Sequence, residues 1–333
     1  MKIFTHTAFT LTYLFICLIL TQNSIAQTIS NKNQLSEASR TYGYLLGQDY
    51  TLNRISIEHP ELETHVIQVK GEFNYKFSNA KERISIALKD ALQQSYSTYE
   101  NKLTSQLDSV LGKQILTRET SIAFIKEVLD RSKGHIPSPI IETLLIYQYN
   151  NGGEEFLDNY TYTFKTKGHA KSKGTDWKIK IPRSWKALEA ERPNIIQKFT
   201  SENGYGNYTI ILMVKDLPLH KGYKASEKEL LETFSLSNAK GMIPEGSTFI
   251  SHKRVVIDNQ PGMVIESSHT EKRLDLEIRF RMIQYVFIYK NQMYITQGMI
   301  AQKSSDMTLE QLSTRFSPLF RLIINSLVLN AQY

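Results

Sequence analysis

Residues 177–185 have the sequence WKIKIPRSW, in which Trp177, Ile179 and Ile181 alternate with two lysines. Apolar side chains at every second position predict a β-strand with one buried face. Pro182 has no backbone N–H to donate, so it closes the strand. This stretch therefore predicts the opening strand of an antiparallel sheet domain.

The residues that follow predict a meander of strands with helices kept apart in the sequence. Strands are expected at 195–199, 208–214, 249–257, 263–267, 274–289 and 293–301. The turn-forming residues 258–262 (DNQPG) predict a hairpin between two of them. Helices are expected at 225–238 and 308–329, the second with a kink or a break at Pro318. This pattern indicates an α+β fold.

The order of these features resembles the PsbP-like and DcrB-like families. The resemblance covers about residues 160–333 and rests on WKIKIPRSW, the hairpin at 257–262 (IDNQPG) and a closing helix that ends in 324–327 (INSL). It implies an α/β/α sandwich and a role in binding or assembly rather than catalysis. It carries over no functional residue, because these families share no site motif, and it gives no counterpart for the first half of the chain.

The first half has the spacing of amphipathic helices. Apolar residues recur at intervals of three and four from Leu62 to Ala91, which predicts a helix of about eight turns. The pattern can continue to Gly112 as one helix or fold back as a hairpin. A helix that long needs antiparallel neighbours or a dimer. Further helices are expected from Leu35, Arg118 and Ile140, so this region is either a partner-binding arm or an ordinary helical layer.

The N-terminus has the features of an export signal. Lys2 precedes an apolar run at 8–20, and small residues at 24 and 26 favour cleavage after Ala26. The alternative is a single anchor helix, for which the run is short. The only cysteine, Cys17, lies inside the run and would leave with the signal. The expected divisions are a signal peptide at 1–26, a helical region at 27–159 and a PsbP-like domain at 160–333.

Charge divides the mature chain at the same place. The 333 residues carry a net charge of +7, with 41% hydrophobic and 22% charged residues, which excludes a largely disordered chain and a polytopic membrane protein. Residues 27–159 hold 14 basic and 17 acidic residues, a net charge of −3, whereas 160–333 hold 25 basic and 16 acidic residues, a net charge of +9. The basic character therefore belongs to the second half.

The most basic stretch is a loop just past this division. It contains Lys165, Lys167, His169, Lys171 and Lys173, together with two glycines that predict a flexible loop. Gathered ammonium groups can bind a phosphate, a lipid headgroup or an acidic polymer. The alternative is a solvated linker.

A second candidate surface combines Trp185, Arg192 and Tyr205, which lie in or beside the loops that join the first strands. Tryptophan, tyrosine and arginine are common anchors of recognition surfaces. The alternative is that Trp185 belongs to the core and that the other two belong to turns.

No catalytic or cofactor motif is present. The eight histidines are scattered, so neither a metal nor a cofactor is expected. Glu154, Glu155 and Asp158 are better explained as surface charges than as catalytic carboxylates, and Ser184 lacks the glycines of a nucleophile elbow. The export signal and the lack of an aromatic-basic RNA motif argue against nucleic acid as a partner.

Together these features predict an exported, non-catalytic envelope protein. Its partner would be an envelope protein or an anionic surface, with at most peripheral membrane association and a homodimer possible through the helices. The alternatives are a periplasmic hydrolase and a small-molecule or lipid carrier with a cavity between sheet and helix. A pocket of several hundred Å³ with converging polar groups would favour these alternatives.

Overall fold

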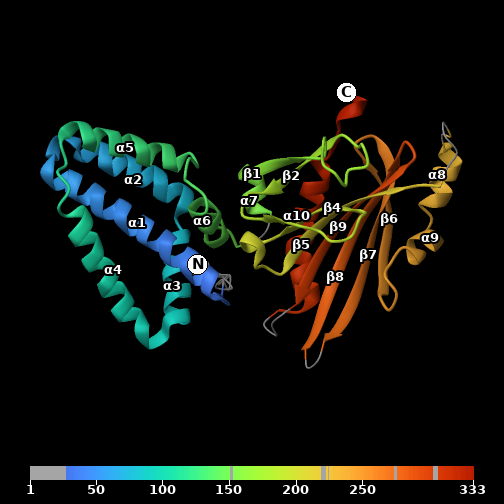
Figure 1. Ribbon diagram of the computed structural model, residues 1–333, viewed down its shortest axis with the longest axis horizontal. Helices are drawn as coiled ribbons and strands as arrows, with labels where there is room; N and C mark the ends of the chain where they lie inside the picture. The colour runs from blue at the N-terminus through green and yellow to red at the C-terminus, as the bar shows by residue number, and fades with distance from the viewer. Residues whose placement is uncertain (1–27, 151–152, 219–222, 224, 274–275, 303–306) are drawn as a thin grey trace, which may run out of the picture.

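The structure, a computed structural model, describes residues 28–150, 153–218, 223, 225–273, 276–302 and 307–333. The expected export signal, with Cys17 and the cleavage site after Ala26, lies outside these residues. The described chain forms a helical half and a β-sheet half, which lie side by side (Figure 1).

The helical half is built from helices joined by short turns. Its elements are α1 (Lys32–Glu58), η1 (Pro60–Leu62), α2 (Glu63–Phe77), α3 (Ala80–Leu92), η2 (Gln93–Ser95), α4 (Tyr96–Leu111), α5 (Arg118–Ser132), α6 (Ile140–Gln148) and α7 (Glu154–Leu157). Each of the longer helices except α4 contributes fully buried residues to one core, which includes Leu45, Leu52, Phe73, Phe77, Ile84, Leu88, Val128 and Leu144.

The long apolar run after Pro60 is divided into three helices. The chain turns at Ser78 and Asn79, between α2 and α3. Gln93 then has a φ of 47°, which is incompatible with an α-helix and ends α3. The helices fold back so that α1 packs against α2, α3 and α4. The chain thus supplies the neighbours that the run requires, and a homodimer stays a prediction.

Gly71 lies on the exposed side of α2 and offers a direct test of helix propensity. No atom lies within 4 Å of the position that its Cβ would occupy. Gly71→Ala is therefore expected to raise the free energy of unfolding by about 1 kcal/mol, because alanine loses less backbone entropy on folding. Urea denaturation of the variant and the wild type measures the difference, and a loss of stability would contradict it.

The second half contains two antiparallel sheets. The larger has the order β3 (Lys186–Leu188), β4 (Ile195–Thr200), β5 (Tyr208–Asp216), β9 (Gln292–Gln302), β8 (Leu276–Tyr289), β7 (Gln260–Arg273) and β6 (Thr248–Ile257). The smaller has the order β1 (Thr161–Lys165), β2 (Trp177–Pro182) and β10 (Val328–Leu329). The expected hairpin joins β6 and β7. Its turn is only Asp258 and Asn259, both with positive φ, as a two-residue hairpin turn of the primed type requires.

Helices cover both faces of the larger sheet. The remaining elements are η3 (Glu202–Gly204), α8 (Glu227–Thr233), α9 (Leu236–Gly241), α10 (Leu309–Asn325) and η4 (Asn330–Gln332). Helix α10 lies between the two sheets, with Phe320 in the same core as Trp177 and Phe287. On the opposite face Phe234, beside α8, packs against Met263. The predicted α+β fold and α/β/α layering are confirmed.

Two of the expected helices differ in detail. The helix expected over 225–238 is two short helices, because the Ser235 side chain caps a new helix by accepting from the Asn238 N–H. The closing helix continues through Pro318, held by buried neighbours such as Phe316 and Leu319. It ends at Asn325, and the last residues form strand β10 instead of further helix.

Candidate functional site

Strand β2 lies in the middle of the smaller sheet and presents its lysines outward. Its apolar residues point into the core and are at most 1% exposed, so Lys178 and Lys180 lie on the other face. On β1, Lys165 pairs directly with Lys178, and Thr163 pairs with Lys180. We name Lys165, Lys178 and Lys180 the lysine face.

The charges of the lysine face are not balanced locally. Two ammonium groups directly opposite each other on a sheet repel and cost stability. Within the described residues, none of the three ammonium groups forms an ion pair or a hydrogen bond. Lys167, two residues after Lys165 in the chain, is exposed as well. The face therefore concentrates positive charge on the outer side of the smaller sheet.

The basic loop between β1 and β2 has a defined fold that hydrogen bonds of its own hydroxyl groups hold together. Thr166, Ser172 and Thr175 are all buried. The Thr166 hydroxyl donates to the Thr175 carbonyl oxygen at 3.0 Å, and the Thr175 hydroxyl donates to the Ser172 carbonyl oxygen at 2.7 Å. Gly168 and Gly174 have φ of 78° and 74°, a left-handed conformation that glycine adopts readily in turns.

This folding separates the basic residues of the loop. Lys173 Nζ lies 2.8 Å from Asp216 Oδ2, and this hydrogen bond holds the pKa of the Asp216 carboxyl below its usual range. Lys171 Nζ donates to the carbonyl oxygen of Ala190. His169 Nδ1 accepts from the Lys171 backbone N–H at 3.2 Å. Lys171 and Lys173 are therefore engaged within the chain, whereas Lys165 and Lys167 point to solvent.

The second candidate surface is not assembled as expected. Trp185 is only 5% exposed and its ring packs edge-on against Phe320, so it belongs to the core and is not available to a partner. Arg192 is exposed on the loop before β4, and Tyr205 is half-buried directly after η3. Because Trp185 is buried, a recognition surface at this place would consist of Arg192 and Tyr205 without the tryptophan. Such a surface stays a prediction.

Glu155 is a buried carboxyl group, so its assignment to the surface is wrong. Its two oxygens accept from the Ser184 N–H at 2.7 Å and from the Ser184 hydroxyl at 2.6 Å. Burial raises the pKa of Glu155 to about 7, even though both hydrogen bonds act to lower it. Nearby, Glu142 of α6 lies 3.8 Å from Arg183 Nε. The sequence gives no signal for this pairing, because 29 residues separate Glu155 from Ser184.

These contacts join the two halves of the chain. Glu155 lies on the last helix of the helical half, and Ser184 follows strand β2. Strand β2 is the second strand of the sheet half, because β1 precedes it, so the expectation that 177–182 opens the sheet is wrong. A second link is made by Asn203, whose amide donates to both carboxylate oxygens of Glu37 on α1 at 3.1 Å. Both Glu155 oxygens accept hydrogen bonds from Ser184, so this carboxyl group helps to hold the helical half against the sheet half.

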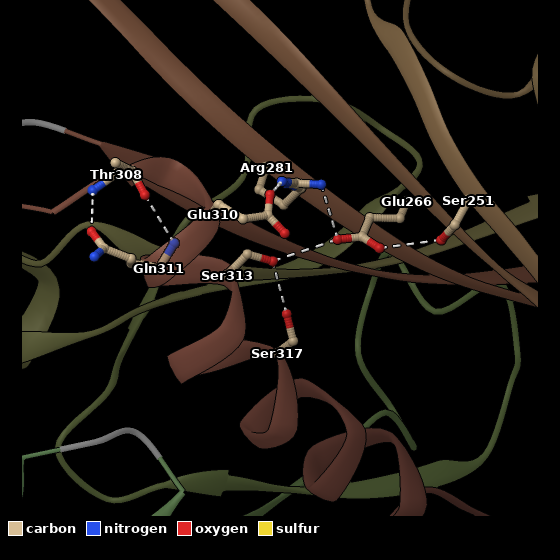
Figure 2. Close-up of polar contacts among 8 residues, drawn as sticks. All are labelled: Ser251, Glu266, Arg281, Thr308, Glu310, Gln311, Ser313 and Ser317. Carbon is tan, nitrogen blue, oxygen red and sulfur yellow. Dashed lines mark hydrogen bonds and ion pairs between the residues drawn. The ribbon is translucent and has the colours of Figure 1, made fainter.

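A second, partly buried polar cluster lies between α10 and the larger sheet (Figure 2). Arg281 of β8 forms ion pairs with Glu266 of β7, at 3.2 Å, and with Glu310 of α10. Glu266 also accepts from Ser251 at 3.1 Å and lies 3.5 Å from the Ser313 hydroxyl. The arginine is thus compensated by two carboxylates, and the cluster has a structural role.

No group of three or more His, Cys, Asp or Glu side chains among the described residues is placed to hold a metal ion. The described helices also include none that is both long and apolar enough to cross a membrane.

Comparison with known proteins gives similarity in structure alone. No family model and no curated protein matches the chain. Similar solved structures include PsbP from Synechocystis sp. PCC 6803, at 11% identity over 51% of this chain and 92% of that chain, with a TM-score of 0.33. The Ran-binding protein Mog1p of Saccharomyces cerevisiae has 7% identity over 51% of this chain and 95% of its own, with a TM-score of 0.32.

LpqN of Mycobacterium tuberculosis, which is involved in cell envelope biogenesis, has 12% identity over 54% of this chain and 96% of its own, with a TM-score of 0.32. The C-terminal half of the chain, with its antiparallel sheet between layers of helices, has the architecture that the PsbP-like resemblance implies.

Proposed function

We propose that this protein is exported, acts by binding rather than by catalysis, and contacts an anionic surface through the lysine face. The observation that supports this proposal is the direct pairing of Lys165 with Lys178, beside Lys180, with no acidic partner among the described residues. Such an arrangement costs stability unless an external anion compensates it.

The distribution of charge along the chain also supports contact with an anionic surface through the sheet half. The half that carries the lysine face has a net charge of +9, whereas residues 27–159 have a net charge of −3. An anionic surface would therefore attract the sheet half and repel the helical half, which orients the protein as it approaches. Each lysine close to an anionic membrane contributes about 1 kcal/mol to the free energy of binding.

A binding role also agrees with the state of the buried polar groups. Glu155 is occupied by Ser184, and Arg281 is compensated by Glu266 and Glu310. Both groups are thus held by partners within the chain, which supports a binding role.

Sedimentation with lipid vesicles tests the proposal. The chain from Gln27 is mixed with vesicles of phosphatidylglycerol and phosphatidylcholine, or of phosphatidylcholine alone. We expect co-sedimentation only with the anionic vesicles, weakening as sodium chloride is raised because salt screens exposed charges. Equal binding to both kinds of vesicle, binding that salt does not change, or no binding at low salt would contradict the proposal.

A further inference from the structure

The helical half contains a groove that the sequence does not indicate. It has a volume of about 560 Å³ and lies among α1, α2 and α3, not between sheet and helix where a carrier cavity was expected. This volume falls within the range of about 300–1,000 Å³ typical of small-molecule sites. The groove is independent of the lysine face, which lies on the other half of the chain.

The base of the groove is apolar and aromatic. Tyr42 and Leu45 of α1 meet Phe73 and Phe77 of α2 there, and all four are at most 6% exposed. The rings of Phe73 and Phe77 lie 5.1 Å apart. A base of this kind receives an apolar body, and the faces of aromatic rings attract cations.

Acidic groups outnumber basic groups at the rim. Asp49 of α1 forms an ion pair with Lys81 of α3, and both side chains are partly exposed. Glu82 adds an exposed carboxylate one residue further along α3. The net charge of the lining is therefore −1, in agreement with the acidic helical half.

Two further polar side chains of the lining already have partners within the chain. Gln48 accepts from Arg131 at 2.9 Å, and the Ser85 hydroxyl lies 2.9 Å from that of Tyr96. The carboxylates of Asp49 and Glu82 are thus the charged acceptors that a ligand meets at the rim.

We infer that the groove binds an amphipathic amine, with its apolar body on the aromatic base and its ammonium group between Asp49 and Glu82. The ammonium group competes with Lys81 for Asp49 and gains Glu82 as a second carboxylate. An alkyl carboxylate of the same chain length would face the two carboxylates of Asp49 and Glu82, which repel it. The one lysine there, Lys81, already forms an ion pair with Asp49. The groove therefore selects cations over anions.

Fluorescence titration with dansylcadaverine, an alkyl primary amine that carries an aromatic dansyl group, tests this inference. We expect saturable binding with one site per chain, displacement by octylamine and no displacement by octanoate. Asp49→Asn combined with Glu82→Gln is expected to weaken binding about tenfold, the effect of two partly exposed ion pairs. Glu63→Gln combined with Asp90→Asn removes two exposed carboxylates of α2 and α3 outside the groove and should leave affinity unchanged.

Thermal melting of both double variants shows whether they fold. Absence of saturable binding, equal displacement by octylamine and octanoate, or equal affinity in a folded Asp49/Glu82 variant would overturn the inference. None of these results bears on vesicle binding, so failure here and failure of the proposed function are distinguishable.

Discussion

Glu155→Gln is expected to abolish a loss of stability that the wild-type protein shows as the pH rises from 4.5 to about 7. Burial raises the pKa of Glu155 to about 7, whereas the ordinary value is 4.5. Between these values the unfolded chain has released this proton and the folded chain still holds it, so a rise in pH favours unfolding. A pKa difference of this size corresponds to about 3 kcal/mol.

Urea denaturation at a series of pH values measures this effect. The free energy of unfolding of Glu155→Gln minus that of the wild type should grow by about 3 kcal/mol across the window and stay level above it. Glu154→Gln, which changes the adjacent and less buried carboxylate of α7, provides the matched baseline. Parallel profiles for Glu155→Gln and the wild type would show that the buried carboxyl does not titrate as expected.

Gly298→Ala is expected to destabilise the sheet half by about 3 kcal/mol, the upper end of the cost of overpacking a core. Gly298 lies on β9 directly under the ring of Phe320 on α10. A Cβ there would lie 2.7 Å from two atoms of that ring, far inside van der Waals contact. Because Phe320 is only 2% exposed, its ring cannot move aside without shifting α10 from the sheet.

A double variant separates this clash from other effects of alanine. In Gly298→Ala with Phe320→Leu the smaller side chain leaves room for the new methyl group, so the two losses should not add. Gly241→Ala in helix α9, where no atom lies within 4 Å of the added Cβ, is the control and should not destabilise the protein. Additive losses in the double variant would contradict the proposed clash.

The sheet half could be predicted in part, because several of its signals are local, whereas strands β1, β3 and β10 were not expected. The alternation in 177–181 and the turn after Ile257 each specify a strand or a hairpin without help from distant residues, and both are present. The limits of the helices were less predictable. The apolar spacing after Pro60 continues across the turn at Ser78 and the positive φ of Gln93, so periodicity alone cannot show that the chain folds back there.

The candidate site could be predicted from the sequence even less well than the helix boundaries. The sequence places Lys171 and Lys173 beside Lys165 and Lys167, but only the fold turns the first two toward Ala190 and Asp216. It also brings Lys178 opposite Lys165, a pairing set by strand register rather than by sequence distance. The tertiary fold decides which side chains form hydrogen bonds, which are buried and which face each other across a sheet. For this reason the sequence alone did not indicate the burial of Glu155 or the groove in the helical half.

Vesicle binding by two sets of lysine variants tests the central claim most directly. Lys165, Lys178 and Lys180 are changed together to alanine in one variant, and Lys171 and Lys173 in the other, with salt and phosphatidylglycerol content held constant. The lysine-face variant should lose roughly a hundredfold in partition coefficient, at about 1 kcal/mol per lysine, whereas the loop variant should bind nearly as the wild type does. Equal losses in both variants, or a larger loss in the loop variant, would contradict the assignment of the lysine face as the binding surface.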